Sequence, residues 1–147
     1  MAYFTEPDEA LDYIYNLIKN NRAALGLGFI GYADEQMLFE YPAVVISFNA
    51  PVDRTLGPLS TFNLAWVIQL IVYHAKLSVD HKTRTREDIQ LAAGIRNKLH
   101  EDYKLGGGVI FGYVRSERPG IIADDRGSAN VATSLIWTAD SRAPINP

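Results

Sequence analysis

Hydrophobic residues are most concentrated between Phe62 and Leu77, in the run FNLAWVIQLIVYHAKL. The run is rich in β-branched and aromatic residues, and a strand that is covered on both faces reads as an almost continuous apolar segment. We therefore expect a central β-strand whose even positions, up to Val72, form the larger face and pack against helices. A buried helix is the alternative, because periodicity alone does not assign a short apolar run. Polar residues such as Gln69 and His74 make the run unsuited to spanning a membrane.

Two segments have the apolar spacing of amphipathic helices. The first runs from Thr5 to Leu25, with Thr5 as its N-cap, acidic residues in its first turn and Gly26 as its stop signal. The second begins after Thr85, whose side chain can cap the helix while Asp88 reaches back to complete a capping box. Its predicted stripe, in which the arginine is partly covered, comprises Ile89, Ala92, Ala93, Arg96, Leu99 and Tyr103.

Shorter apolar segments indicate further strands. A loop from Asn49 to Ser60 returns the chain to the central strand, so the strands on either side of this loop are expected to pair antiparallel. Strands that cluster while helices stand apart indicate an α+β fold. We predict a single domain, residues 1–147, with a mostly antiparallel β-sheet of four to five strands and two α-helices packed on one face. The shorter strands are placed at residues 29–32, Tyr41–Phe48, Val109–Arg115 and Asn130–Ala139.

The segment from Ser116 to Ser128 is rich in charged residues and turn formers. This composition predicts a projecting loop or hairpin arm, with the adjacent aliphatic residues Ile121 and Ile122 in its middle. Aliphatic side chains on a polar projection are explained if the arm packs against its own subunit or the next one. Residues 141–147 are predicted to fray or to dock on a neighbour. The candidate subunit-interface residues are Arg115, Glu117, Arg118, Ile121, Ile122, Asp124, Asp125, Arg126 and Arg142.

Composition limits the chemistry that is open to the chain. The sequence has 147 residues, no cysteine and a formal net charge of −3. The lack of cysteine excludes disulfides, thiol nucleophiles and Cys-ligated zinc, and the acidic balance argues against a general attraction to nucleic acid. The N-terminus lacks the basic start and apolar core of a signal peptide, so neither a signal peptide nor a membrane anchor is expected.

Motifs for catalysis or cofactor binding do not fit their required context. The glycines from Gly26 to Gly31 match GxGxxG, but a helix precedes them and no amphipathic helix follows, so nucleotide binding is not expected. The histidines His74, His81 and His100 lack metal-ligand spacing, and structural roles are expected for them. We predict that the protein is not an enzyme and uses no cofactor or metal.

Several of these segments together resemble the tail terminator (tail completion) proteins of long-tailed bacteriophages, the lambda-type terminator family. The resemblance covers nearly the whole chain. It rests on the N-terminal helix that ends in a glycine, the strand YPAVVI at Tyr41–Ile46, the long strand centred on Trp66, the helix that ends near Leu99, and the closing stretch LIWTADSRAP at Leu135–Pro144.

The resemblance implies a non-enzymatic virion protein at the head-proximal end of the tail, assembled in the host cytoplasm. Such proteins form a ring, usually a homohexamer, that caps the tail tube, terminates tail polymerisation and provides the interface for head-tail joining. The implied partners are other copies of the chain, the tail tube protein and a head-completion or neck protein. DNA passes through the lumen without specific binding, and no membrane is involved.

Two alternatives from other classes stay open. One is another neck or head-completion structural protein. The other is a small ligand-binding or enzymatic α+β domain that uses a cleft near His74 or His81, which a deep polar pocket with a perturbed titratable group would favour.

The basic turn Lys82, Arg84 and Arg86 has three interpretations. It faces the lumen, where few phosphate contacts are needed so that DNA transit is not slowed. It is a docking surface for an acidic tail tube. Alternatively, it is a solvated turn that is neutralised locally by Asp80, Glu87 and Asp88.

Overall fold

The computed structural model describes residues 3–32, 40–48, 52–123 and 127–144. Its helices are α1 (Pro7–Asn20), α2 (Arg22–Leu25), α3 (Arg86–Glu101) and the short 3-10 helix η1 (Leu105–Gly107). Its strands are β1 (Phe29–Tyr32), β2 (Ala43–Ser47), β3 (Asp53–Leu56), β4 (Thr61–Lys76), β5 (Phe111–Ala123) and β6 (Ala129–Pro144).

One six-stranded sheet is organised around β4, which is 16 residues long. The strand order is β1-β2-β4-β6-β5, and β3 pairs with the first part of β4 while β2 pairs with its second part. Among the described strands, β1 and β2 are parallel and the other pairs are antiparallel. The predicted α+β fold is confirmed, with one strand more than the four to five expected.

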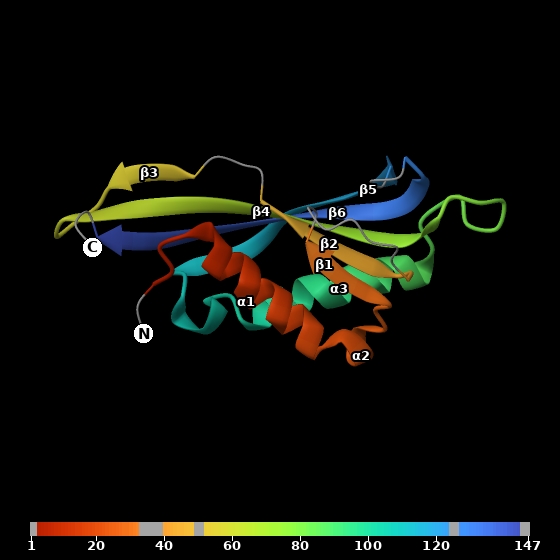
Figure 1. Cartoon of the computed structure of the whole chain (residues 1–147), viewed down its shortest axis with the longest axis horizontal. Coiled ribbons are helices and arrows are strands. Elements are labelled where there is room, and N and C mark those ends of the chain that lie inside the picture. Colours follow the sequence, from red (N-terminus) through yellow and green to blue (C-terminus); the bar gives the residue numbers. More distant parts are fainter. Residues whose placement is uncertain (1–2, 33–39, 49–51, 124–126, 145–147) are drawn as a thin grey trace.

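The helices lie on one face of this sheet, and the sheet extends past them along its length (Figure 1). The even positions of β4 from Leu64 to Val72 are buried on the helix face, whereas the odd positions from Asn63 to Ile71 are half-buried. On the same face, the indole of Trp137 from β6 is fully buried with that of Trp66. The prediction for the central strand and its larger face is confirmed.

The predicted first helix is divided into α1 and α2 at Asn21. The Asn21 side-chain amide donates to the carbonyl of Leu17 at 2.8 Å, a local bond that competes with helix continuation. Thr5 is not the N-cap as predicted: Glu6 holds that position without a side-chain cap bond, and Pro7 follows it at the start of the helix. The glycine stop is confirmed, because Gly26 ends α2 in the left-handed conformation with φ 71°.

Two predicted loops contain paired strand. Residues 116–123 continue β5 and pair with β6, so the arm is an extension of the sheet. The edge position of β5 explains why Pro119 is tolerated, since a missing backbone donor costs little there. Within the predicted loop 49–60, residues 53–56 form β3; residues 49–51 lie outside the described part.

The prediction that residues 141–147 fray or dock on a neighbour is wrong for the described part of that segment, which continues the sheet. β6 runs to Pro144, and its last four residues pair with the start of β4, from Thr61 to Leu64. Ser141 is fully buried, and its hydroxyl donates to the carbonyl of Phe4 at 2.9 Å. The reason is tertiary, because the long β4 supplies a ladder partner for every one of these residues.

The capping box of α3 is confirmed. The Thr85 hydroxyl accepts from the backbone N–H of Asp88 at 3.3 Å, and the Asp88 carboxylate accepts from the backbone N–H of Thr85 at 3.0 Å. The predicted apolar stripe is partly wrong, since Ile89 is exposed and Ile95 takes the buried position. The helix is rotated so that Asp88 itself faces inward.

Candidate functional site

The predicted arm is a β-hairpin built from the ends of β5 and β6. Arg115 and Arg118 are exposed on β5. Glu117, in contrast, forms a salt bridge of 2.6 Å with Arg96 of α3, which ties the arm to its own subunit. The predicted interface residues Asp124, Asp125 and Arg126 lie outside the described residues.

The two adjacent isoleucines of the arm have different environments. Ile121 is exposed, whereas Ile122 is half-buried and packs against the small cluster formed by Ala43, Tyr73 and Ala132. Successive side chains of a strand point to opposite faces, so one of the pair meets the sheet and the other does not. Only Ile121 offers exposed apolar surface for a partner.

Arg142 does not lie with the arm. It is exposed on β6 and pairs with Asn63 near the start of β4. Ile121 pairs with Val131, which lies beside Ala75 near the end of β4. The residues predicted as one interface are therefore divided between opposite ends of the sheet.

The basic turn between β4 and α3 is not uniform. Lys82 and Arg86 are exposed, whereas Arg84 is half-buried. Asp88, one of the three acidic residues that would neutralise this turn in the third interpretation, is engaged by histidines instead. Only Lys82 and Arg86 fully present their charge to a partner.

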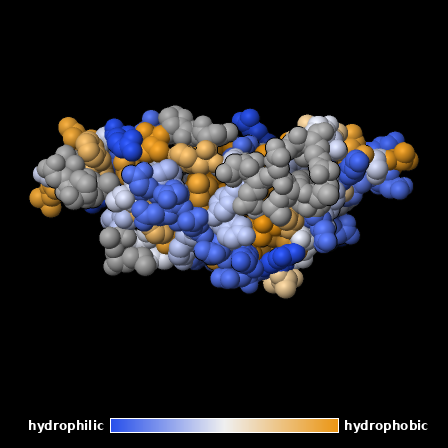
Figure 2. Space-filling view, in the orientation of Figure 1, coloured by the Kyte–Doolittle hydropathy of each residue, from blue (hydrophilic) through white to orange (hydrophobic). Residues whose placement is uncertain are grey.

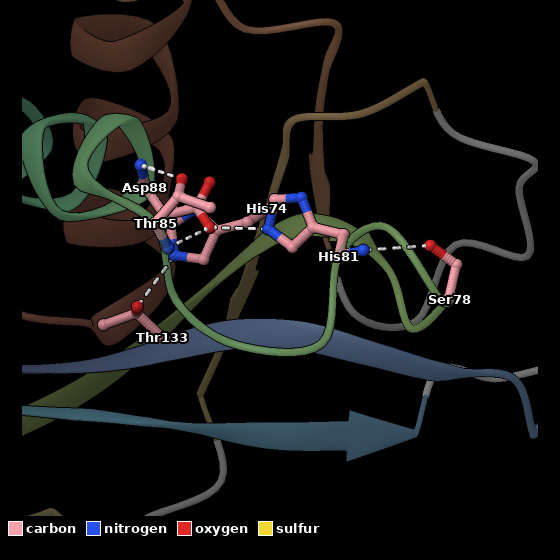
Figure 3. A network of polar contacts seen from close by, with 6 residues as sticks. All are labelled: His74, Ser78, His81, Thr85, Asp88 and Thr133. Carbon is pink, nitrogen blue, oxygen red and sulfur yellow. Dashed lines mark hydrogen bonds and ion pairs between the residues drawn. The ribbon is translucent and has the colours of Figure 1, made fainter.

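Asp88 contacts two histidines that belong to different parts of the fold, one in β4 and one in the turn that follows it. His81 from the turn lies 2.7 Å from Asp88 through Nε2 and Oδ2, and His74 from β4 approaches the other oxygen at 3.7 Å (Figure 3). His74 also shares a hydrogen bond of 2.8 Å with the Thr133 hydroxyl of β6. This cluster was not predicted from the sequence. The available signal was that Asp88, the aspartate of the capping box, follows His81 by seven residues.

Burial sets the charge states in this cluster. Burial lowers the pKa of His74; Asp88 opposes this, while Arg84 and His81 add to it. Burial alone would raise the pKa of Asp88, but the hydrogen bonds from the Thr85 N–H and the His81 side chain, with the electrostatic interaction of the two imidazoles, bring it below its ordinary value. The result is a neutral His74 beside an ionised Asp88 at neutral pH.

The cluster is poorly placed to meet a substrate. The His74 side chain is 0% exposed, and Asp88 is occupied by the helix cap and by His81. Among the described residues, no group of three or more His, Asp or Glu side chains is arranged to hold a metal ion. The third histidine, His100, accepts a bond of 2.9 Å from the backbone N–H of Val114. These contacts join helices and turns to the sheet.

A second feature that sequence analysis missed is an aromatic pocket at the start of β5. It has a volume of about 350 Å³ and is lined by His100, Tyr103, Phe111, Gly112 and Tyr113. The Phe111 ring lies between its neighbours, with centroid distances of 5.2 Å to Tyr103 and 5.8 Å to Tyr113. The alternation of aromatic residues around Gly112 was the available sequence signal.

The sheet ends in exposed apolar residues. Leu56 and Leu59, in the hairpin between β3 and β4, are 78% and 95% exposed. Val79, in the turn after β4, is 84% exposed. Figure 2 shows hydrophobic residues at both ends of the long axis. The end with Leu56 and Leu59 was not predicted to be an apolar contact surface, whereas the other end includes Ile121 of the predicted arm.

No protein-family model matches the sequence, and no curated protein matches it. In the part of the chain that the structure describes, no helix is long and apolar enough to cross a membrane.

Proposed function

We propose that the protein is a tail terminator of a long-tailed bacteriophage, forming a ring that caps the tail tube and receives the head-completion protein. The observation that carries the proposal is the elongated sheet, which extends past its helices (Figure 1) and has exposed apolar side chains near its ends. Leu56 and Leu59 are exposed together in one hairpin, and apolar side chains that are grouped in this way suit a surface that a partner covers.

The two ends of the sheet present different groups, so the chain has unlike surfaces that are available for the contacts of a closed ring. One end carries the hairpin with Leu56 and Leu59, and the other carries the basic turn and the paired residues around Ile121 and Ile122 of the β5–β6 arm. When one patch meets a different patch on the next copy, the contact is heterologous and generates a ring if the rotation closes. The family resemblance of the sequence supports the same assembly.

The basic turn is proposed as the surface that docks on the tail tube. Lys82 and Arg86 are exposed at the end of the molecule, and rim charges of this kind steer association and fix orientation more than they add affinity. Their number is small, which also suits a ring that DNA crosses without being held.

Electron microscopy of the purified protein, alone and mixed with tail tubes of the phage that encodes it, tests this function. We expect rings alone and rings at the ends of tubes in the mixture. Lys82→Glu should reduce capping without loss of rings, whereas the matched control Lys19→Glu, an exposed lysine on α1, should not. Tubes that are never capped by the parent protein would contradict the terminator role.

A further inference from the structure

Leu59 is held in an unusual state at the tip of the β3–β4 hairpin. It is 95% exposed, and its φ of 55° places a non-glycine residue in the left-handed region. Two hydrogen bonds hold the turn: Gly57 N–H donates to the Thr61 carbonyl at 2.8 Å, and the Thr61 hydroxyl donates to the Pro58 carbonyl at 2.6 Å. The isolated subunit thus bears both backbone strain and apolar exposure at one residue.

The aromatic pocket at the start of β5 has the matching character. Its rings, Tyr103, Phe111 and Tyr113, are each partly exposed. Behind them, Gly112 lies so close to the Trp137 indole that an added Cβ would come within 2.4 Å of it, so the floor is firmly packed. The pocket is an open depression of about 350 Å³, which is large enough by volume for a leucine side chain.

The tip and the pocket lie on opposite sides of the β4–β6 pair. β3 flanks β4 on one side, and β5 flanks β6 on the other. The β3–β4 hairpin lies at one end of the sheet (Figure 1). Two different patches on opposite sides of one chain form a heterologous contact between copies.

Exposed charges of opposite sign lie beside the two features. Arg54 lies on the hairpin, with Asp53 at its base, and Glu101 lies beside the pocket, whose rim also carries Lys104 over the Tyr103 ring. Asp140 and Arg142 are two residues apart on β6, so they do not distinguish the two features. Opposite charges around an apolar centre steer docking and fix its register.

We propose that Leu59 of one copy inserts into the Tyr103–Phe111–Tyr113 pocket of a second copy, and that Leu56 covers the rim of that pocket. This contact deepens the proposed function by naming one of the surfaces through which the ring closes, and it rests on that function for closure. Burial of Leu59 offsets the left-handed strain that the free subunit carries.

Disulfide trapping tests the contact directly, because the chain has no cysteine and any disulfide must come from introduced residues. The single variants Leu59→Cys and Tyr113→Cys are mixed at equal concentration and oxidised. The mixed disulfide should form at least about tenfold faster than in a control mixture of Val79→Cys and Tyr113→Cys, because a docked pair has a high effective concentration. Equal rates in the two mixtures would overturn the proposal.

A second variant separates the contact from folding. Asn tolerates the left-handed region better than Leu, so Leu59→Asn should keep or raise the melting temperature of the subunit. It should nevertheless lose self-association in light scattering. If the parent forms rings and Leu59→Asn forms them equally well, the contact is wrong and the terminator role stands. If Leu59→Asn abolishes association but the parent never caps tubes, the contact stands and the terminator role is wrong.

Discussion

The carboxylate of Asp88 lies 2.7 Å from Nε2 of His81, across the first turn of α3. The same carboxylate accepts the backbone N–H of Thr85, so one side chain both caps the helix and holds the preceding turn. The orientation of the basic turn therefore depends on a buried helix cap.

Replacement of Asp88 by alanine should lower the free energy of unfolding by about 1–3 kcal/mol, because both the cap and the bond to His81 are lost. Urea denaturation measures the effect. The exposed neighbour Glu87 provides the matched control, and Glu87→Ala should stay within about 0.5 kcal/mol of the parent. Equal losses in the two variants would contradict the assigned role of Asp88.

Stability should fall on mild acidification because of His74. Its folded-state pKa is lowered by burial, so the unfolded chain takes up a proton first as the pH falls below about 6.5. The contribution is fully present above that value and is lost toward the lower folded pKa, with a limiting slope of about 1.4 kcal/mol per pH unit. Unfolding free energies from about pH 5 to 7.5 check this, since His74→Gln should flatten the curve in that range.

Asp88 adds a second loss of stability at more acidic pH. Its folded pKa is lowered, so its contribution is present above the unfolded value of about 3.9 and is lost as the pH falls through the folded value. The parent should therefore lose stability more steeply below about pH 4 than Asp88→Asn does. If the stability of the two proteins falls with the same slope in acid titrations, Asp88 is not the group responsible.

Gly112→Ala should destabilise the subunit by about 1–3 kcal/mol, because the added methyl group overlaps the Trp137 indole at 2.4 Å. Gly120 lies on the same strand with nothing within 4 Å of an added Cβ, so Gly120→Ala is the control and should be neutral or slightly stabilising. Thermal unfolding of both variants makes the comparison. An unchanged melting temperature in Gly112→Ala would mean that the Trp137 side chain moves to make room for the added methyl group.

The salt bridge between Arg96 and Glu117 should give a coupling energy of about 0.5–1 kcal/mol in a double-mutant cycle with alanine. The bridge is partly exposed, so the coupling should shrink as salt is added. Additive effects of the two substitutions would show that the arm is not tied to α3 through this pair.

Local chemistry in the sequence determined the elements whose signals are self-contained. The apolar run around Trp66 predicted the central strand and its larger face, and Thr85 with Asp88 predicted the helix start. Gly26 predicted the end of the helix, because glycine adopts the left-handed conformation at a helix end without steric strain. Each of these signals depends on residues that are close together in the sequence, so the sequence alone is enough to recognise it.

The tertiary structure decided what depends on partners distant in sequence. Residues 116–123 are charged and rich in turn formers, yet they form strand because β6 supplies their backbone partners; the same reason extends β6 through Ser141 to Pro144 along β4. His74, His81 and Asp88 have no common motif and meet only because β4, the turn and α3 pack together. Hydrogen-bond ladders and buried charge pairs form between whichever groups the fold brings within a few ångströms, and that distance is not encoded in spacing along the chain.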